Sequence, residues 1–260
     1  MQRRARSSCP EGAPRVSVRY HFTTIGSTNA RAVELLDAGE TPPFWVTAGR
    51  QIMGRGRLGR SWTSEPGNLY ATLAFHANVS IHRLPELSFV LAVALRRAVV
   101  EVTADERFSV KWPNDLMHGR RKLAGLLLER VGERDVLAGF GVNCTHAPPD
   151  LGNRAASLTE LGHEVEPDRL LDALDHHAGD ALSTWEDQGF ERLRNEWRDH
   201  AFGLGEPATV RGARGTTSGI AEDIDDTGRL LLRTPNGVET ISAGDWLPDD
   251  AAASETRSYG

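Results

Sequence analysis

The hydrophobic positions of residues 16–142 follow the two periods that distinguish strands from helices. Short apolar runs separated by turn residues predict strands. Apolar residues at helical spacing predict a capped helix that starts at Ser27-Thr28-Asn29 and ends at Gly39, and a longer helix over residues 84–102. The predicted strands cover residues 16–22, 44–48, 68–75, 108–112, 123–128 and 136–142. We therefore expect an α+β fold in which helices flank one mixed sheet.

The pattern changes in the C-terminal part of the chain. Residues 167–185 have the apolar face of a long amphipathic helix, and Phe190, Leu193 and Trp197 mark a second helix. After Gly203-Leu204-Gly205 the sequence alternates between short strand patterns and turns. The predicted strands cover residues 208–211, 219–224, 230–233 and 239–241. About forty residues of this kind indicate a small β-barrel.

These patterns divide the chain into four parts. Residues 1–15 carry Arg, Ser, Pro and Gly without periodicity, so we expect a disordered N-terminal tail. Residues 16–204 form the larger domain and residues 205–248 the small barrel. We expect residues 249–260 to be a frayed tail.

Composition limits the class of protein. The chain has 260 residues, of which 39% are hydrophobic and 25% charged, as in ordinary globular proteins. A net charge of −6 argues against bulk nucleic-acid binding. The two cysteines, Cys9 and Cys144, lie far apart, which argues against a disulfide framework or zinc knuckle and favours a reducing compartment. The chain has neither a signal-peptide pattern nor an apolar stretch suited to a membrane span, so we expect a cytoplasmic protein.

Four arginines lie within eleven residues of an otherwise acidic protein. No Asp or Glu occurs between Glu40 and Glu65, and three glycines separate the arginines. Glycine lets backbone N–H groups approach an anion, and arginine offers forked donors that suit phosphate or carboxylate. An arginine run alone would fit a solvated loop equally well, but the glycines and an adjacent tryptophan favour an anion site. We call residues 54–62 the arginine-glycine loop; the arginines are Arg50, Arg55, Arg57 and Arg60.

Two familiar nucleotide motifs do not explain this loop. Gly54-x-Gly56-x-x-Gly59 satisfies a dinucleotide fingerprint, but the residues after it cannot open a long helix and no acidic residue follows at the required distance. A P-loop is excluded because the chain has no GxxxxGK[ST] sequence.

Three further segments place polar residues at strand ends. Pro113 keeps Trp112 extended, so residues 110–112 should end a strand and Asn114-Asp115 should start a loop. Arg121-Lys122-Leu123-Ala124-Gly125 begins an apolar strand, and Gly139-Phe140-Gly141-Val142-Asn143 ends one. Each segment alone also fits a structural turn or a solvated strand end. Their occurrence together, in this order, predicts one polar site for a nucleotide.

Together these motifs resemble the signature set of the biotin protein ligases, over roughly residues 16–247. The arginine-glycine loop and Lys111-Trp112-Pro113-Asn114-Asp115 are the most specific matches. Bifunctional members have an N-terminal winged helix-turn-helix, and nothing of that kind precedes residue 16. The resemblance implies a catalytic domain of the class II synthetase-like, biotin/lipoate ligase type with a C-terminal SH3-like barrel.

The resemblance also implies the reaction and the residues. Such an enzyme activates biotin with ATP and Mg²⁺ to biotinyl-5′-AMP and releases pyrophosphate. It then transfers biotin to a lysine of a biotin carboxyl carrier protein or of a carboxylase's biotinyl domain. The catalytic candidates are Lys122, Arg57, Lys111 and Asp115, with no protein metal ligand. The biotin candidates are Ser27, Thr28, Asn29, Gln51, Arg55, Gly56, Arg57, Tyr70, Lys122, Gly125 and Gly139, and the ATP and adenylate candidates are Arg55, Arg57, Trp62, Lys111, Asn114, Lys122 and Asn143.

Two alternatives were weighed. Lipoate ligases share the fold class and the adenylation chemistry, but the Lys-Trp-Pro-Asn-Asp block favours biotin. A nucleic-acid-binding protein could use the arginine-glycine loop and the barrel, but the acidic barrel residues Glu222, Asp223, Asp225 and Asp226 would repel phosphates. We expect no DNA or membrane partner and either a monomer or a homodimer.

Overall fold

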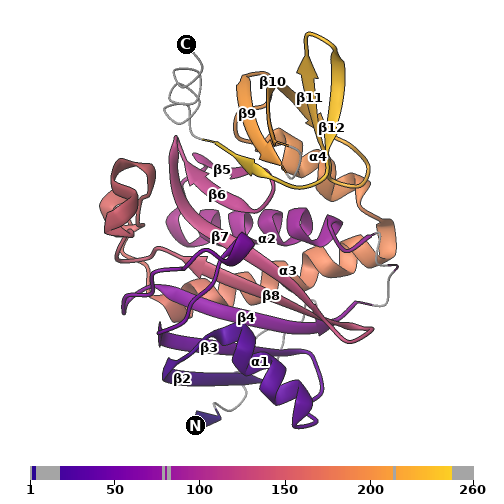
Figure 1. Ribbon diagram of the computed structural model, residues 1–260. Helices are drawn as coiled ribbons and strands as arrows, with labels where there is room; N and C mark the ends of the chain where they lie inside the picture. The colour runs from indigo at the N-terminus through magenta and orange to yellow at the C-terminus, as the bar shows by residue number, and fades with distance from the viewer. Residues whose placement is uncertain (1, 4–17, 78–79, 81–82, 213–214, 248–260) are drawn as a thin grey trace.

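The structure is a computed structural model that describes residues 2–3, 18–77, 80, 83–212 and 215–247 (Figure 1). One large mixed sheet forms its centre, in the strand order β1-β2-β3-β4-β8-β7-β6-β5. Strands β2 and β3 are parallel, and the other neighbouring pairs are antiparallel. In this spatial order the strands are Gln2–Arg3, Arg19–Ile25, Phe44–Gln51, Leu69–His76, Asp135–Val142, Arg121–Val131, Asp115–His118 and Phe108–Lys111.

Helices cover both faces of this sheet, which confirms the predicted α+β class. On one face, Trp45 and Leu73 join the main core with α2 (Glu86–Thr103), α3 (Pro167–Gln188) and α4 (Glu191–Asp199). On the other face, Phe44 and Val46 pack against α1 (Thr28–Asp37). The two cores alternate along β3 because successive side chains of a strand point to opposite faces. Among the α-helices of the described residues, only the short α1 packs on the second face, so part of the sheet there is left for a cavity.

One strand of this sheet differs from the sequence prediction. Residues Asn114-Asp115 were expected to start a loop, but Asp115 begins β6, which pairs with both β5 and β7. The loop interpretation was wrong because Pro113 ends β5 only locally: a tight turn returns the chain at once into an antiparallel strand, with Lys111 opposite Asp115. This hairpin places Asp115 opposite Gly125 of β7.

The C-terminal unit is a five-stranded antiparallel sheet, in the order β12-β11-β10-β9-β13. Its strands are β9 (Pro207–Gly212), β10 (Gly215–Ile224), β11 (Leu230–Thr234), β12 (Gly237–Ile241) and β13 (Asp245–Trp246). The first four confirm the predicted strands, while β13 was not predicted. Closure into an SH3-like barrel and the four-part division of the chain stay predictions, and the tails expected at residues 1–15 and 249–260 lie outside the described residues except for β1.

The C-terminal unit contacts the larger domain directly. Trp112 donates its indole N–H to the carbonyl of Gly228 at 3.1 Å, and Lys111 Nζ donates to the carbonyl of Trp246 at 3.2 Å. Arg198 of α4 pairs with Asp223 of β10 at 2.9 Å. Lys111 of β5 and Trp112 of the following turn therefore hold strand β13 and the β10–β11 turn of the second unit. Within the described part of the chain, no helix is both long and apolar enough for a membrane crossing.

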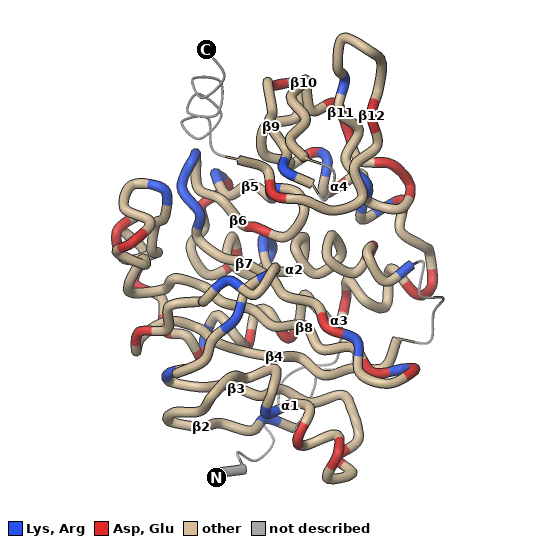
Figure 2. Tube along the Cα trace, viewed as in Figure 1, with Lys and Arg blue, Asp and Glu red and all other residues tan. Residues whose placement is uncertain are grey.

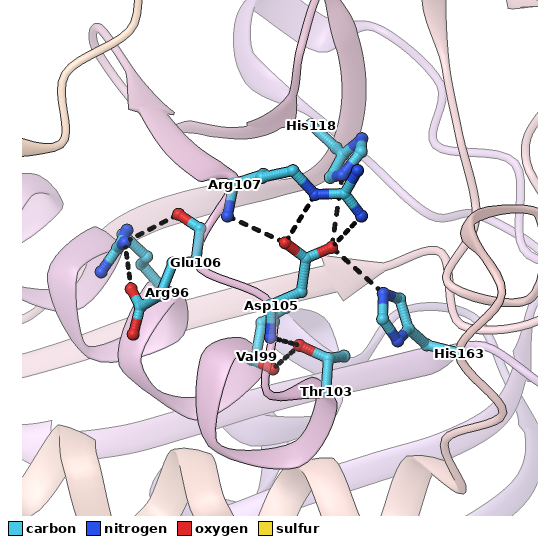
Figure 3. Close-up of polar contacts among 8 residues, drawn as sticks. All are labelled: Arg96, Val99, Thr103, Asp105, Glu106, Arg107, His118 and His163. Atoms are coloured by element: carbon cyan, nitrogen blue, oxygen red, sulfur yellow. Dashed lines mark hydrogen bonds and ion pairs between the residues drawn. The ribbon is translucent and has the colours of Figure 1, made fainter.

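The buried carboxylate of Asp105 contacts Arg107, His118 and His163, which lie on three different segments of the chain (Figure 3). Asp105 follows α2, accepts the backbone N–H of Arg107 at 3.0 Å and pairs with the Arg107 guanidinium at 2.7 Å. Its second oxygen lies 3.2 Å from His163 Nε2 and 3.4 Å from His118 Nε2. Hydrogen bonds from Arg107, the largest cause, hold the pKa of Asp105 well below its usual range.

We expect Asp105→Asn to lower the free energy of unfolding by about 2 kcal/mol at neutral pH, because a buried charge-assisted network is lost. The folded state depresses the pKa of this carboxyl, so its contribution is full above the unfolded pKa of about 4 and is lost as pH falls toward the folded value. Urea unfolding between pH 7 and pH 3 should show the two proteins converging in acid. Asp172→Asn, whose side chain is 66% exposed, is the control and should change stability by less than about 0.5 kcal/mol. A constant difference across this pH range would contradict the assignment.

Candidate active site

A cavity of about 460 Å³ lies on the α1 face of the sheet, over β7 and β8. Its walls are the start of α1, the arginine-glycine loop, the turn between β5 and β6, the segment 148–155 and the beginning of β13. Figure 2 shows basic residues, in blue, on the segments around β6 and β7 in this region. The cavity thus brings together residues from Ser27 to Trp246, which are more than two hundred positions apart in the sequence.

Glycines form the floor of the cavity. Gly125 of β7 and Gly141 of β8 are direct cross-strand partners, while their neighbours Leu126 and Phe140 belong to the core on the opposite face. The Trp62 ring lies against both glycines: an added Cβ would approach this ring to 2.5 Å at Gly141 and 3.2 Å at Gly125. Small residues are therefore required here because a flat ring occupies the space above the backbone.

At one end of the cavity lies the N-terminus of α1. Ser27 occupies the N-cap position but forms no side-chain cap bond, and Gln51 Oε1 accepts the Thr28 backbone N–H at 2.8 Å in its place. The predicted helix start is thus confirmed, with the capping role taken by Gln51. Because Ser27 does not cap, its hydroxyl stays available at the cavity wall.

The arginine-glycine loop folds back on itself as a small hairpin. Trp62 N–H donates to the carbonyl of Gly54 at 2.9 Å, and Gly56 N–H donates to that of Arg60 at 2.7 Å. Within residues 54–62, positive φ occurs at Leu58 (55°) and Gly59 (72°). At Gly54 glycine is needed for space and not for a positive φ, since an added Cβ would lie 2.6 Å from the carbonyl oxygen of Trp62.

Four predicted cations line this one cavity, and each already has a partner. Lys122 Nζ lies 2.5 Å from Asp115 Oδ1, and Lys111 donates to the Trp246 carbonyl. The remaining two belong to the arginine-glycine loop. Arg57 donates to Asn114 Oδ1 at 3.1 Å and to the carbonyl of Gly244 at 3.0 Å, and Arg55 pairs with Glu129 at 3.7 Å.

Burial lowers the pKa of two of these cations. Desolvation is the largest cause that lowers the pKa of Lys111, and Asp115 opposes it. Desolvation likewise lowers the pKa of Arg57, opposed mainly by Asp245. Partly desolvated cations interact more strongly with a bound anion than exposed ones do. An added phosphate or carboxylate would therefore favour the charged forms.

The structure brings nearly all predicted site residues together. The cavity lining includes every biotin, nucleotide and catalytic candidate except Tyr70. Tyr70 is 1% exposed, donates its hydroxyl to the Glu65 carbonyl at 2.8 Å, and has its pKa raised to about 12 mainly by burial. The structure therefore does not place Tyr70 at the cavity wall, because its hydroxyl is held by the segment that precedes β4.

Several cavity residues were missed by the sequence analysis. Asp245 Oδ1 accepts from Arg60 at 2.7 Å, and Trp246 lines the cavity from the C-terminal unit. Thr72 and Glu129 lie behind the cavity wall and hold Asn29. A usable signal existed for Glu129, which is the first acidic residue after the apolar run of β7. No sequence signal distinguished Thr72 from an ordinary β-branched strand residue.

Other reactive residues lie away from the cavity. Cys144 is 1% exposed, and burial raises the pKa of its thiol to about 12, which makes it a poor nucleophile. His176 and His177 are adjacent on α3, and Asp180 lies 3.4 Å from His176 Nε2 one turn further along this helix. These three residues are the one group within the described ranges whose ligand atoms could hold a metal, and none of them lines the cavity.

Comparisons with known proteins agree with this geometry. Residues 22–143 match the model of the Biotin/lipoate A/B protein ligase family, and residues 203–245 match that of the biotin protein ligase C-terminal domain. The chain is 38% identical over 235 residues to a biotin–[acetyl-CoA-carboxylase] ligase of Paracoccus denitrificans, covering 84% of this chain and 95% of that protein.

Solved structures lead to the same family. The biotin protein ligase of Aquifex aeolicus in complex with biotin and ATP aligns with a TM-score of 0.78 at 27% identity, covering 88% of this chain and 97% of that one. The Leishmania major biotin protein ligase in complex with biotinyl-5-AMP aligns with a TM-score of 0.64 at 26% identity, covering 90% and 100% of the two chains.

The fold and the cavity thus define a ligase of the biotin/lipoate class. Within that class, the 38% identity across nearly the whole of a relative decides the assignment. The chain belongs to the biotin protein ligase family.

Proposed function

We propose that this protein joins biotin to a carrier-protein lysine at the expense of ATP, through biotinyl-5′-AMP. The observation that carries the proposal is the single cavity in which Arg55, Arg57, Lys111 and Lys122 converge between the start of α1 and Trp62. A carboxylate and a triphosphate repel each other, and clustered cations reduce that repulsion where the new bond forms.

In the first half-reaction, an oxygen of the biotin carboxylate attacks the α-phosphorus of ATP. The new P–O bond forms the mixed anhydride, the bond to the bridging oxygen of the β-phosphate breaks, and pyrophosphate carries away the negative charge. Lys122 stands nearest the floor glycines and Trp62, with Nζ 5.4 Å from the ring centroid, and would bridge the biotin carboxylate and the α-phosphate. Arg57 and Lys111 would neutralise the phosphates.

In the second half-reaction, the carrier lysine amine attacks the carbonyl carbon of the anhydride. The C–O bond to phosphate breaks, AMP leaves, and the amine loses a proton. Asp115 is the candidate to orient that amine or accept its proton, and its pairing with Lys122 at 2.5 Å would change once a phosphate engages Lys122. A carboxylate that gives up its lysine partner becomes a better proton acceptor.

The two ends of the cavity suit the two substrates. Ser27, Thr28, Asn29 and Gln51 offer hydroxyl and amide groups to the polar head of biotin, with Gly56, Gly125 and Gly139 beside its rings and tail. Trp62 offers a platform to adenine, and its buried Nε1 has no partner within the described part of the chain. Asn114 and Asn143 lie nearby, although both already donate to backbone carbonyls.

The remaining assignments complete the proposal. Mg²⁺ would accompany the nucleotide and share the charge of its phosphates. Three carboxylates line the cavity: Asp115 and Asp245 are paired with Lys122 and Arg60, and Asp150 is the third. The partner would be the biotinyl domain of acetyl-CoA carboxylase. Cytoplasmic location, a monomeric or homodimeric state and the lack of a DNA partner stay predictions of the sequence.

We expect Gly141→Ala to weaken nucleotide binding by about tenfold or more, because the new methyl group would force the Trp62 ring out of its position. An added Cβ at Gly26 meets no atom within 4 Å, so Gly26→Ala is the control. Isothermal titration with a non-hydrolysable ATP analogue measures both. Equal affinities for Gly141→Ala and the unaltered protein would remove Trp62 from the nucleotide site.

The decisive experiment mixes purified protein, ATP, Mg²⁺ and biotin, and follows biotinyl-5′-AMP by mass spectrometry. A biotinyl domain is then added, with a version whose acceptor lysine is replaced by arginine as the control. Lipoate offered beside biotin in a pyrophosphate-release assay distinguishes the two ligase classes. Failure to form any biotinyl adenylate would reject the proposed function.

A further inference from the structure

The Asn29 amide is held at both ends by side chains behind the cavity wall. Asn29 is the second residue of α1 and is 4% exposed. Its Oδ1 accepts the Thr72 hydroxyl at 2.6 Å, and its Nδ2 donates to Glu129 Oε2 at 2.6 Å. Gly139 closes the same place from β8, since an added Cβ would lie 2.4 Å from Asn29 Oδ1.

The partners determine which way the amide faces. The Thr72 hydroxyl can donate or accept, but an ionised Glu129 carboxylate can only accept. The amide NH₂ group must therefore point toward Glu129, because the reverse orientation would place two acceptor oxygens against each other. The amide nitrogen carries a second N–H, and Asn29 lines the cavity. Asn29 consequently presents a hydrogen-bond donor to a ligand in that part of the cavity.

Glu129 also connects this helix start to the arginine-glycine loop. Its second carboxylate oxygen lies 3.7 Å from the Arg55 guanidinium. Gly125, Leu127 and Glu129 alternate along β7 and so share the cavity face of the strand. Gly125 and Leu127 line the cavity, while Glu129 stands just beyond them. One carboxylate thus links β7, α1 and the loop.

We propose that Glu129 and Thr72 are positioning residues for the vitamin substrate. Through Asn29 they fix a donor toward a hydrogen-bond acceptor on the polar head of biotin, such as its cyclic urea oxygen. This inference rests on the proposed function, because it assumes that biotin's head lies at the start of α1. Neither residue touches the substrate. Both act through Asn29; the Thr72 hydroxyl also lies 2.8 Å from Thr28 Oγ1, and Glu129 also pairs with Arg55.

The test separates positioning from folding. Thr72→Val keeps the shape of the side chain but removes its hydroxyl donor, and Glu129→Gln removes the charge that orients the amide. We expect each to raise the KM for biotin by about 10-fold, with the KM for ATP within about 2-fold of the unaltered enzyme. Thr72→Ser should restore the KM for biotin to within about 3-fold. Glu133→Gln, in the exposed β7–β8 turn, is the matched control and should change neither constant.

A double-mutant comparison tests the route of the effect. In an Asn29→Ala background, Thr72→Val should raise the KM for biotin by less than about 3-fold, because the Asn29 amide is gone and only the contact of Thr72 with Thr28 remains. Thermal unfolding of each variant shows whether the protein is folded at the assay temperature. An unchanged KM for biotin in both folded single variants, or full additivity with Asn29→Ala, would overturn the inference. That result is distinct from failure of the proposed function, in which the unaltered protein itself forms no biotinyl adenylate.

Discussion

Replacing Lys122 with alanine lowers the rate of biotinyl-adenylate formation by about 100- to 1000-fold, while the Kd for biotin rises by no more than about tenfold. The Lys122 ammonium is needed most when negative charge gathers between the carboxylate and the α-phosphate, so its loss raises the barrier more than it weakens ground-state binding. Single-turnover quench experiments measure the first quantity and equilibrium titration with biotin the second. Equal losses in both would make Lys122 an ordinary binding residue.

This substitution also leaves Asp115 without its partner, so the design needs two controls. Lys122→Ala combined with Asp115→Asn removes both charges: if the unpaired carboxylate caused the defect, the double variant would recover activity. We expect no recovery in adenylate formation. Arg121→Ala changes the preceding residue, whose guanidinium pairs with Glu160 at 3.5 Å and which does not line the cavity, and should leave the rate within about 2-fold.

Arg57→Gly should increase the release of biotinyl-5′-AMP into solution by about 10- to 100-fold, with biotin then appearing on lysines of bystander proteins. The substitution removes the bonds from the arginine-glycine loop to Asn114 and to the Gly244 carbonyl, and the added glycine increases the loop's freedom. With fewer anchors, the loop should shield the anhydride less well. We expect adenylate synthesis itself to fall by less than about 10-fold.

Filtration followed by mass spectrometry measures the free adenylate, and peptide mapping of an added bystander protein counts the modified lysines. Arg57→Lys keeps the charge but loses the forked geometry, so it separates electrostatic retention from the double anchor. Complete retention of the adenylate by Arg57→Gly, together with an unmodified bystander, would exclude the proposed role of Arg57.

The sequence alone located most of the cavity because its signals are local. Two segments are conspicuous in the sequence. Residues 54–62 concentrate arginine and glycine in an acidic protein, and the residues around Pro113 place polar side chains at the end of an apolar strand. Short apolar runs on either side of a turn-like stretch were sufficient to predict β7 and β8. The hairpin after Pro113 was missed because a proline followed by Asn-Asp is also typical of a loop, and only pairing with β5 and β7 identifies β6.

What could not be predicted depends on contacts between distant parts of the chain. Asp245 and Trp246 reach the cavity only because β13 pairs with β9, and that pairing has no short-range pattern. Thr72 looks like any β-branched residue of a buried strand until α1 places Asn29 against it. Tyr70 was assigned to the cavity from family likeness, which specifies a residue type but not where its hydroxyl is held.

The charge pairs of the cavity also bear on which anions it accepts. Lys122, Arg60 and Arg55 each face a carboxylate already, so an arriving ligand must displace internal competitors. A small monovalent ion can replace one of them at a time and gains little over the partner it expels. A nucleotide triphosphate carries several negative groups on one molecule, so it can exchange several partners in one binding event. The internal carboxylates therefore reduce binding of small monovalent anions and favour a ligand with several negative groups.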